Sequence, residues 1–64
     1  MEDIFLREDS FSGEPWYNEF QMFLRIGVCC PAPEHIDAVM DALERMGYNT
    51  RKTQRGGVTF IVGA

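Results

Sequence analysis

The sequence reads PEHIDAVMDALERMG over residues 33–47, and this stretch decides the fold of the chain. Pro33 suits the first turn of a helix, and Gly47 suits a left-handed cap at its end. Apolar side chains between them recur at the three- and four-residue steps that stack on one helix face: Ile36, Val39, Met40, Leu43 and Met46. We therefore predict a helix over residues 33–46 that packs on a core through this apolar stripe.

The same helix carries a second stripe, the acidic edge, made of Glu34, Asp37, Asp41 and Glu44. At about 100° per residue these positions gather in an arc about 80° wide, and no basic residue falls within it. The four carboxylates span about 15 Å, with neighbours about 5–6 Å apart, which is comparable to the step between phosphates along a nucleic-acid strand. Such an edge is either a solvated outer face or a contact surface for a basic partner.

Residues 16–30 alternate between apolar and polar side chains, which predicts a half-buried strand of about ten residues. Phe23 alone interrupts the polar face, and the proline pair at 31 and 33 ends the strand. Carried to the end of this stretch, the alternation points Cys30 inward and leaves Cys29 as an exposed thiol.

Residues 48–62 read as a hairpin that turns at Gly56-Gly57. Its first strand is polar on both faces and suits an edge, whereas residues 58–62 suit the centre of the sheet. Val58, Phe60 and Val62 are expected to meet the apolar stripe of the helix. The predicted class is α+β: a mainly antiparallel sheet of three or four strands with one helix on one face, in the order β-α-β-β.

This order resembles the first two-thirds of a ferredoxin-like domain, the fold of ACT and heavy-metal-associated domains. The resemblance covers residues 20–62 and lacks the last helix and strand of that fold, so residues 1–16 or a second chain would have to substitute for them. We expect one domain over 1–64, with a core at 17–64 and an acidic, aromatic segment at 1–16. Ile4–Arg7 reads as an edge strand or a helical turn, and Asp9–Pro15 as a loop.

The composition indicates a small cytoplasmic protein without a membrane span or a secretion signal. The 64 residues carry a net charge of −4, unevenly placed: −5 over residues 1–19, −2 over 20–47 and +3 over 48–64. Most of such a surface repels a nucleic-acid backbone, so we expect no direct nucleic-acid binding and favour a basic protein as the partner.

The sequence contains no catalytic motif, and we expect no enzyme activity and no cofactor. Cys29 and Cys30 are adjacent, so they lack the C-x-x-C spacing that lets two sulfurs converge on one metal ion. His35 could act as a base for Cys29, but no third group orients its imidazole. We therefore assign neither a catalytic nor a metal site.

Small size, acidity and an unpaired carboxylate row make the chain resemble phage-encoded anti-CRISPR inhibitors, a class without a shared motif. The resemblance implies a non-enzymatic inhibitor in the bacterial cytoplasm that covers a basic DNA-binding surface of a CRISPR effector, with a monomer favoured over a homodimer. The alternative is a homodimeric sensor of the ACT-like or metal-binding kind. Predicted partner contacts are the acidic edge, two further acids and two aromatic side chains: Glu34, Asp37, Asp41, Glu44, Glu14, Glu19, Trp16 and Tyr17.

Overall fold

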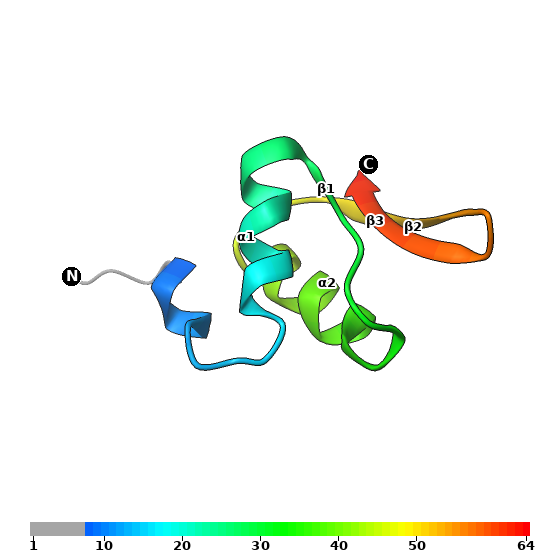
Figure 1. Ribbon diagram of the computed structural model, residues 1–64. Helices are drawn as coiled ribbons and strands as arrows, with labels where there is room; N and C mark the ends of the chain where they lie inside the picture. Colours follow the sequence, from blue (N-terminus) through cyan, green and yellow to red (C-terminus); the bar gives the residue numbers. More distant parts are fainter. Residues whose placement is uncertain (1–7) are drawn as a thin grey trace.

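Two α-helices and a three-stranded antiparallel sheet build the part of the chain that the computed structural model describes, residues 8–64 (Figure 1). Short 3-10 turns, η1 and η2, precede each helix. In chain order the elements are η1 (Glu8–Phe11), α1 (Tyr17–Ile26), β1 (Val28–Cys29), η2 (Pro33–His35), α2 (Ile36–Arg45), β2 (Thr50–Arg55) and β3 (Val58–Gly63). This is the predicted α+β class. The prediction for Ile4–Arg7 lies outside the described residues, and the predicted loop at 9–15 begins inside η1.

The sheet has the order β1-β3-β2, so the last strand lies between the other two and is antiparallel to both. This confirms the predicted arrangement. The hairpin closes at Gly56 and Gly57, whose φ angles are +57° and +81°. Two successive left-handed residues make a type I′ turn, whose twist matches that of the paired strands, and glycine adopts this conformation without a steric penalty.

The predicted strand over residues 16–30 is wrong, because most of this stretch forms α1 and only Val28–Cys29 is a strand. Trp16, Phe20 and Phe23 follow steps of four and three residues, and all three are buried. Gly27 ends the helix with φ +83°, and its N–H donates to the Phe23 carbonyl at 2.8 Å. Alternation and helical periodicity coexist in this stretch, and burial of the aromatic face favours the helix.

The predicted helix over residues 33–46 is confirmed as η2 followed by α2. Gly47, at φ +95°, donates its N–H to the Glu44 carbonyl, and the Tyr48 N–H donates to the Leu43 carbonyl at 3.0 Å. This pair of bonds is a Schellman motif, which satisfies carbonyls left free at a helix end. The cap reverses the chain and leads it into β2.

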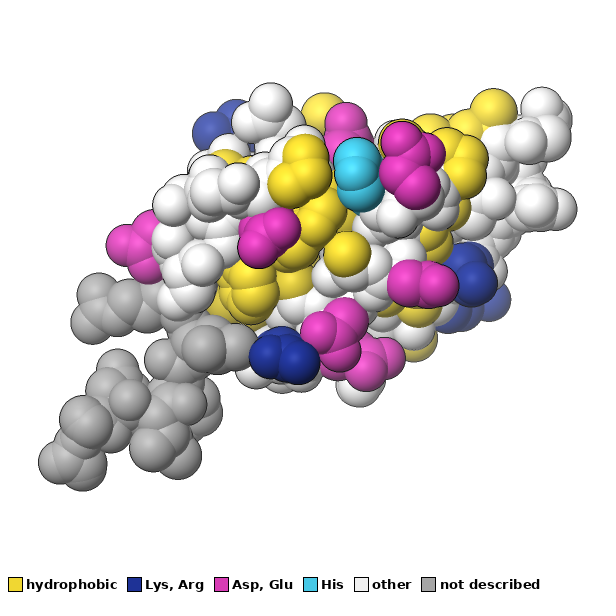
Figure 2. All heavy atoms as spheres, turned by 90° about the horizontal axis from the view of Figure 1, so that it is seen from below, with side chains coloured by type: hydrophobic (Ala, Val, Ile, Leu, Met, Phe, Trp, Pro, Cys, Tyr) yellow, Lys and Arg dark blue, Asp and Glu magenta, His cyan; other side chains and the backbone are white. Residues whose placement is uncertain are grey.

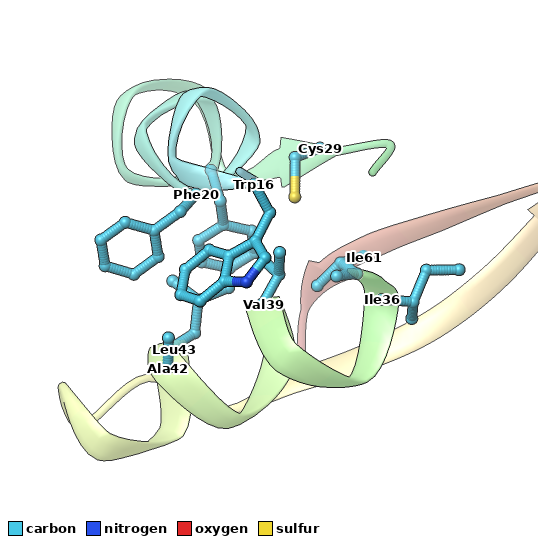
Figure 3. Packing of buried hydrophobic residues seen from close by; sticks show 9 residues of the cluster. Trp16, Phe20, Cys29, Ile36, Val39, Ala42, Leu43 and Ile61 are labelled. Carbon is cyan, nitrogen blue, oxygen red and sulfur yellow. The ribbon is translucent and has the colours of Figure 1, made fainter. Parts of the chain in front are cut away.

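The core lies between α1, α2 and one face of the sheet (Figure 3). α1 contributes its aromatic side chains, and Phe11 of η1 packs on Phe20 with ring centroids 5.2 Å apart. Met40 and Met46 of the apolar stripe are partly buried at its margin. The buried apolar residues are Trp16, Phe20, Phe23, Cys29, Ile36, Val39, Ala42, Leu43 and Ile61.

The register of the sheet corrects which residues face the helices. Cys29 pairs with Ile61, and both are buried on the helix side. Val58, Phe60 and Val62 alternate with Ile61 along β3 and therefore point to the opposite face, not toward the helix as predicted. A strand that is apolar on both faces carries no signal that distinguishes the two sides.

Candidate functional site

The acidic edge lies on η2 and α2, and its four carboxylates are on exposed residues. Asp37 has 97% of its side chain exposed, and Asp41 has 62%. Figure 2 shows acidic side chains spread over the face of the molecule that is seen from below, with apolar surface between them. The apolar stripe of α2 turns into the core, so the helix presents its charged side outward.

Two cations partly neutralise this edge, which the sequence did not predict. The Arg45 Nε lies 2.9 Å from Asp41 Oδ2, one helical turn away, and both side chains are 62% exposed. Lys52 reaches across from β2 and places its Nζ 4.0 Å from Asp37 Oδ1. Exposed pairs of this kind contribute little to stability, but they reduce the local negative charge. Glu34 and Glu44 form no ion pair with any other residue in the range 8–64.

The two further acids predicted as contacts lie on the N-terminal side of the fold. Glu14 is exposed in the turn before α1, and Glu19 is half-buried in the first turn of α1. Burial raises the pKa of the Cys29 thiol most, and the charge of Glu19 raises it further.

Trp16 and Tyr17 belong to an aromatic cluster that also includes Phe11 and Phe20. Trp16 is 7% exposed and meets Phe20 edge-on, with ring centroids 6.0 Å apart at 80°. Tyr17 is half-buried and lies 6.1 Å from Phe20 by ring centroids. These ring contacts hold η1 and the following turn against α1. Most of the surface of Trp16 and Tyr17 is therefore in contact with the rest of the protein.

The cysteine assignments are reversed in the structure. Cys29 is 2% exposed, and burial first, then the charges of Glu19 and Cys30, raises the pKa of its thiol to about 11. The buried thiol stays protonated at neutral pH and is a poor nucleophile. Cys30 is half-buried and is the more accessible thiol. Within residues 8–64, no three His, Cys, Asp or Glu side chains converge as ligands for a metal ion.

An open groove of about 620 Å³ separates the start of α2 from the hairpin, which extends beyond the helix. Asp37 and Lys52 line it from opposite sides, and Gln54 Nε2 donates to Thr59 Oγ1 at 3.3 Å among its lining residues. Its polar groups thus largely pair with one another. The remaining lining residues are Pro33, Ile36 and Thr53.

Comparison of the chain with models of protein families, with curated proteins and with solved structures finds no match. None of the helices within residues 8–64 has the length and apolar character needed to cross a bilayer.

Proposed function

We propose that the protein is a non-enzymatic inhibitor that binds another protein through the acidic edge of α2. The observation that supports this is the separation of charge across the fold. The acidic edge lies on the helix side of the sheet. Arg51 and Arg55 are the cross-strand partners of Val62 and Val58, so they lie on the opposite side. The arginines therefore do not neutralise the acidic edge, and a basic partner meets a face of one dominant sign.

The partner proposed is a basic, nucleic-acid-binding surface. Carboxylates one turn apart on α2 repeat at about 5–6 Å, close to the phosphate step, so cations arranged for a phosphate backbone can meet them in sequence. Lys52 and Arg45 each hold one carboxylate of this edge, and a stronger cationic partner must displace them. Displacing exposed ion pairs costs little, because each contributes at most about 1 kcal/mol.

A CRISPR effector is the target that the resemblance to anti-CRISPR inhibitors implies. Its DNA-binding channel is positively charged, and DNA must occupy it before any cleavage. A small acidic domain that enters this channel blocks DNA sterically and electrostatically, and it needs no reaction of its own. The absence of a catalytic motif from the sequence is compatible with this mode of action.

DNA cleavage by a set of purified CRISPR effectors, with and without the protein, tests the proposal. We expect the parent to inhibit at least one effector. The set Glu34→Gln, Asp37→Asn, Asp41→Asn and Glu44→Gln should abolish this inhibition while the far-ultraviolet circular dichroism stays unchanged. The matched control, Arg51→Gln with Arg55→Gln, changes charges on the opposite face and should inhibit like the parent. Equal inhibition by the neutralised set and the parent contradicts the proposal.

A further inference from the structure

The second surface of interest is the open face of the sheet, defined by the side chains that point away from α1 and α2. Cross-strand partners share a face, so the register assigns its members. They are Val28, Arg51, Thr53, Arg55, Val58, Phe60 and Val62. The buried residues of both helices pack instead with Cys29 and Ile61 on the other face, and Figure 1 shows α2 along one side of the sheet.

The open face is apolar where an uncovered antiparallel sheet is usually polar. All three outward residues of the central strand β3 are apolar, and Val58 is 44% exposed. Val28 of β1 continues the apolar row beside Val62. A shallow hollow of about 220 Å³ lies over this row, and its remaining lining residues are Thr53, Arg55 and Phe60. The sequence of β3 is thus typical of a strand covered on both faces.

The charge of the open face restricts what can cover it. Arg51 and Arg55 are exposed on the edge strand β2, and the register places no acidic residue on the face within residues 8–64. A symmetric contact with a second copy would oppose guanidinium groups to guanidinium groups.

We propose that the open face binds an amphipathic helix of another protein, with its apolar side on β3 and carboxylates along one edge. A helix laid along the strands would follow β3 and pass beside β2. Arg51 and Arg55 lie four residues apart on one strand, which is about 13 Å. Carboxylates seven or eight residues apart on a helix lie on one side at about 10–12 Å, so two of them match the two arginines.

A nucleic-acid strand fits this face less well than an acidic helix. Phe60 is the single aromatic side chain that residues 8–64 place on the face, whereas strand-binding platforms stack successive bases on several aromatic rings. The net charge of −4 also repels a phosphate backbone at long range. Three valines, in contrast, match an aliphatic helix surface.

A titration of the ¹⁵N-labelled protein with a synthetic peptide, followed by nuclear magnetic resonance, tests this inference. The probe is an amphipathic peptide of about 14 residues, long enough to follow β3, with leucines on one side and two glutamates seven residues apart. We expect saturable shifts at Val28, Phe60 and Val62, and not at α2. A control peptide with glutamine at both glutamate positions should bind more weakly by about fivefold or more.

The adjacent cations of β2 supply a matched control in the protein. Arg51→Glu should weaken peptide binding about as strongly as the glutamine peptide does, whereas Lys52→Glu, one residue away on the other face, should not. No shift at peptide concentrations up to about 1 mM would overturn the proposal. The proposal would also be overturned if Arg51→Glu and Lys52→Glu weakened peptide binding equally.

Three further outcomes would assign the face to another occupant and overturn the proposal. One is tighter binding of single-stranded oligothymidine than of the peptide at the same residues. Another is a dimer in sedimentation velocity whose formation shifts the signals of the open face. The third is a shift at Arg51 and Val28 when Glu2→Lys and Asp3→Lys are made in the full chain without peptide, because residues 1–7 would then occupy the face.

Discussion

The ring of Phe23 in α1 meets the ring of Tyr48 edge-on, with centroids 5.9 Å apart and planes inclined at 82°. Phe23 is 5% exposed, and Tyr48, which follows the cap of α2, is 43% exposed. The contact therefore joins the last turn of α1 to the segment that follows α2, at the end of the core where β1 and β2 begin. It secures the helix that the sequence did not predict to the one that it did.

Removing the buried ring should destabilise the fold strongly. We expect Phe23→Ala to lower the free energy of unfolding by about 3–5 kcal/mol, because it leaves a cavity beside α2. Tyr48→Ala should cost less, and the double variant should show a coupling of about 0.5–1.5 kcal/mol from the edge-on contact. Urea denaturation of the four proteins measures this cycle. An unchanged midpoint for Phe23→Ala would mean that α1 lies outside the core.

Residues 33–47 could be predicted because their signals agree: one apolar stripe, a proline at the start and a glycine at the end. Residues 16–30 gave conflicting signals. Their even positions alternate as in a strand, while Trp16, Phe20 and Phe23 repeat as in a helix. Phe23, which breaks the alternation, was the informative residue, because only a helix places it beside Phe20 in the core. Gly27, with its left-handed φ, marks the helix end within the same stretch.

The errors about which residues face the core have two sources. The predicted orientation of Cys29 and Cys30 was extended from the alternation of residues 16–26. Most of those residues form α1, which ends at Gly27, so their alternation does not determine which way the side chains of the following strand point. The sequence of β3 did not indicate which of its side chains face the core, because apolar residues lie on both of its faces. The acidic edge could be placed from helical spacing alone, whereas the Lys52–Asp37 approach depends on the sheet position of β2 and could not.

Truncation within the apolar stripe of α2 should show which positions form the core. Leu43 is fully buried, and we expect Leu43→Ala to cost about 2–5 kcal/mol, a large part of the stability of so small a domain. Met40 is only partly buried, so Met40→Ala should cost clearly less. Thermal melts monitored by circular dichroism compare the two. Similar losses for both would show that Leu43 has no special place in the core.

The two cysteines should differ in reactivity, in the opposite order to the sequence prediction. With Cys30→Ser, the remaining Cys29 should react slowly with iodoacetamide at pH 8, because burial and a pKa near 11 keep its thiol protonated. With Cys29→Ala, the remaining Cys30 should react faster. Mass spectrometry of timed samples gives both rates. Faster alkylation of Cys29 than of Cys30 would contradict its burial.

The Cys29 thiol should make the stability of the protein depend on pH in the alkaline range. Folding raises the pKa of Cys29 from 9.0 to about 11, so the unfolded chain releases this proton at lower pH than the folded one. The contribution of this thiol to the free energy of unfolding is fully present below pH 9 and is lost as the pH rises through about 11. We expect the free energy of unfolding to fall more steeply across this window in the parent than in Cys29→Ala. Parallel pH profiles of the two proteins would exclude Cys29 as the source.

The hairpin turn should tolerate asparagine at one glycine and resist alanine at the other. Asn-Gly is a favoured type I′ pair, so Gly56→Asn should leave stability nearly unchanged. Gly57→Ala places a side chain at φ +81° and should cost about 1–2 kcal/mol. Denaturant midpoints measure both. If alanine at 57 is as well tolerated as asparagine at 56, the turn does not have the type I′ conformation.

Competition with DNA tests most directly whether the acidic edge occupies a site meant for nucleic acid. A CRISPR effector that the protein inhibits is first saturated with fluorescent target DNA, and the protein is then titrated while anisotropy reports bound DNA. We predict full displacement of DNA by the parent, a weaker apparent affinity as salt rises, and no displacement by the set neutralised at Glu34, Asp37, Asp41 and Glu44. A ternary complex, in which the protein binds while the DNA stays bound, would contradict the account.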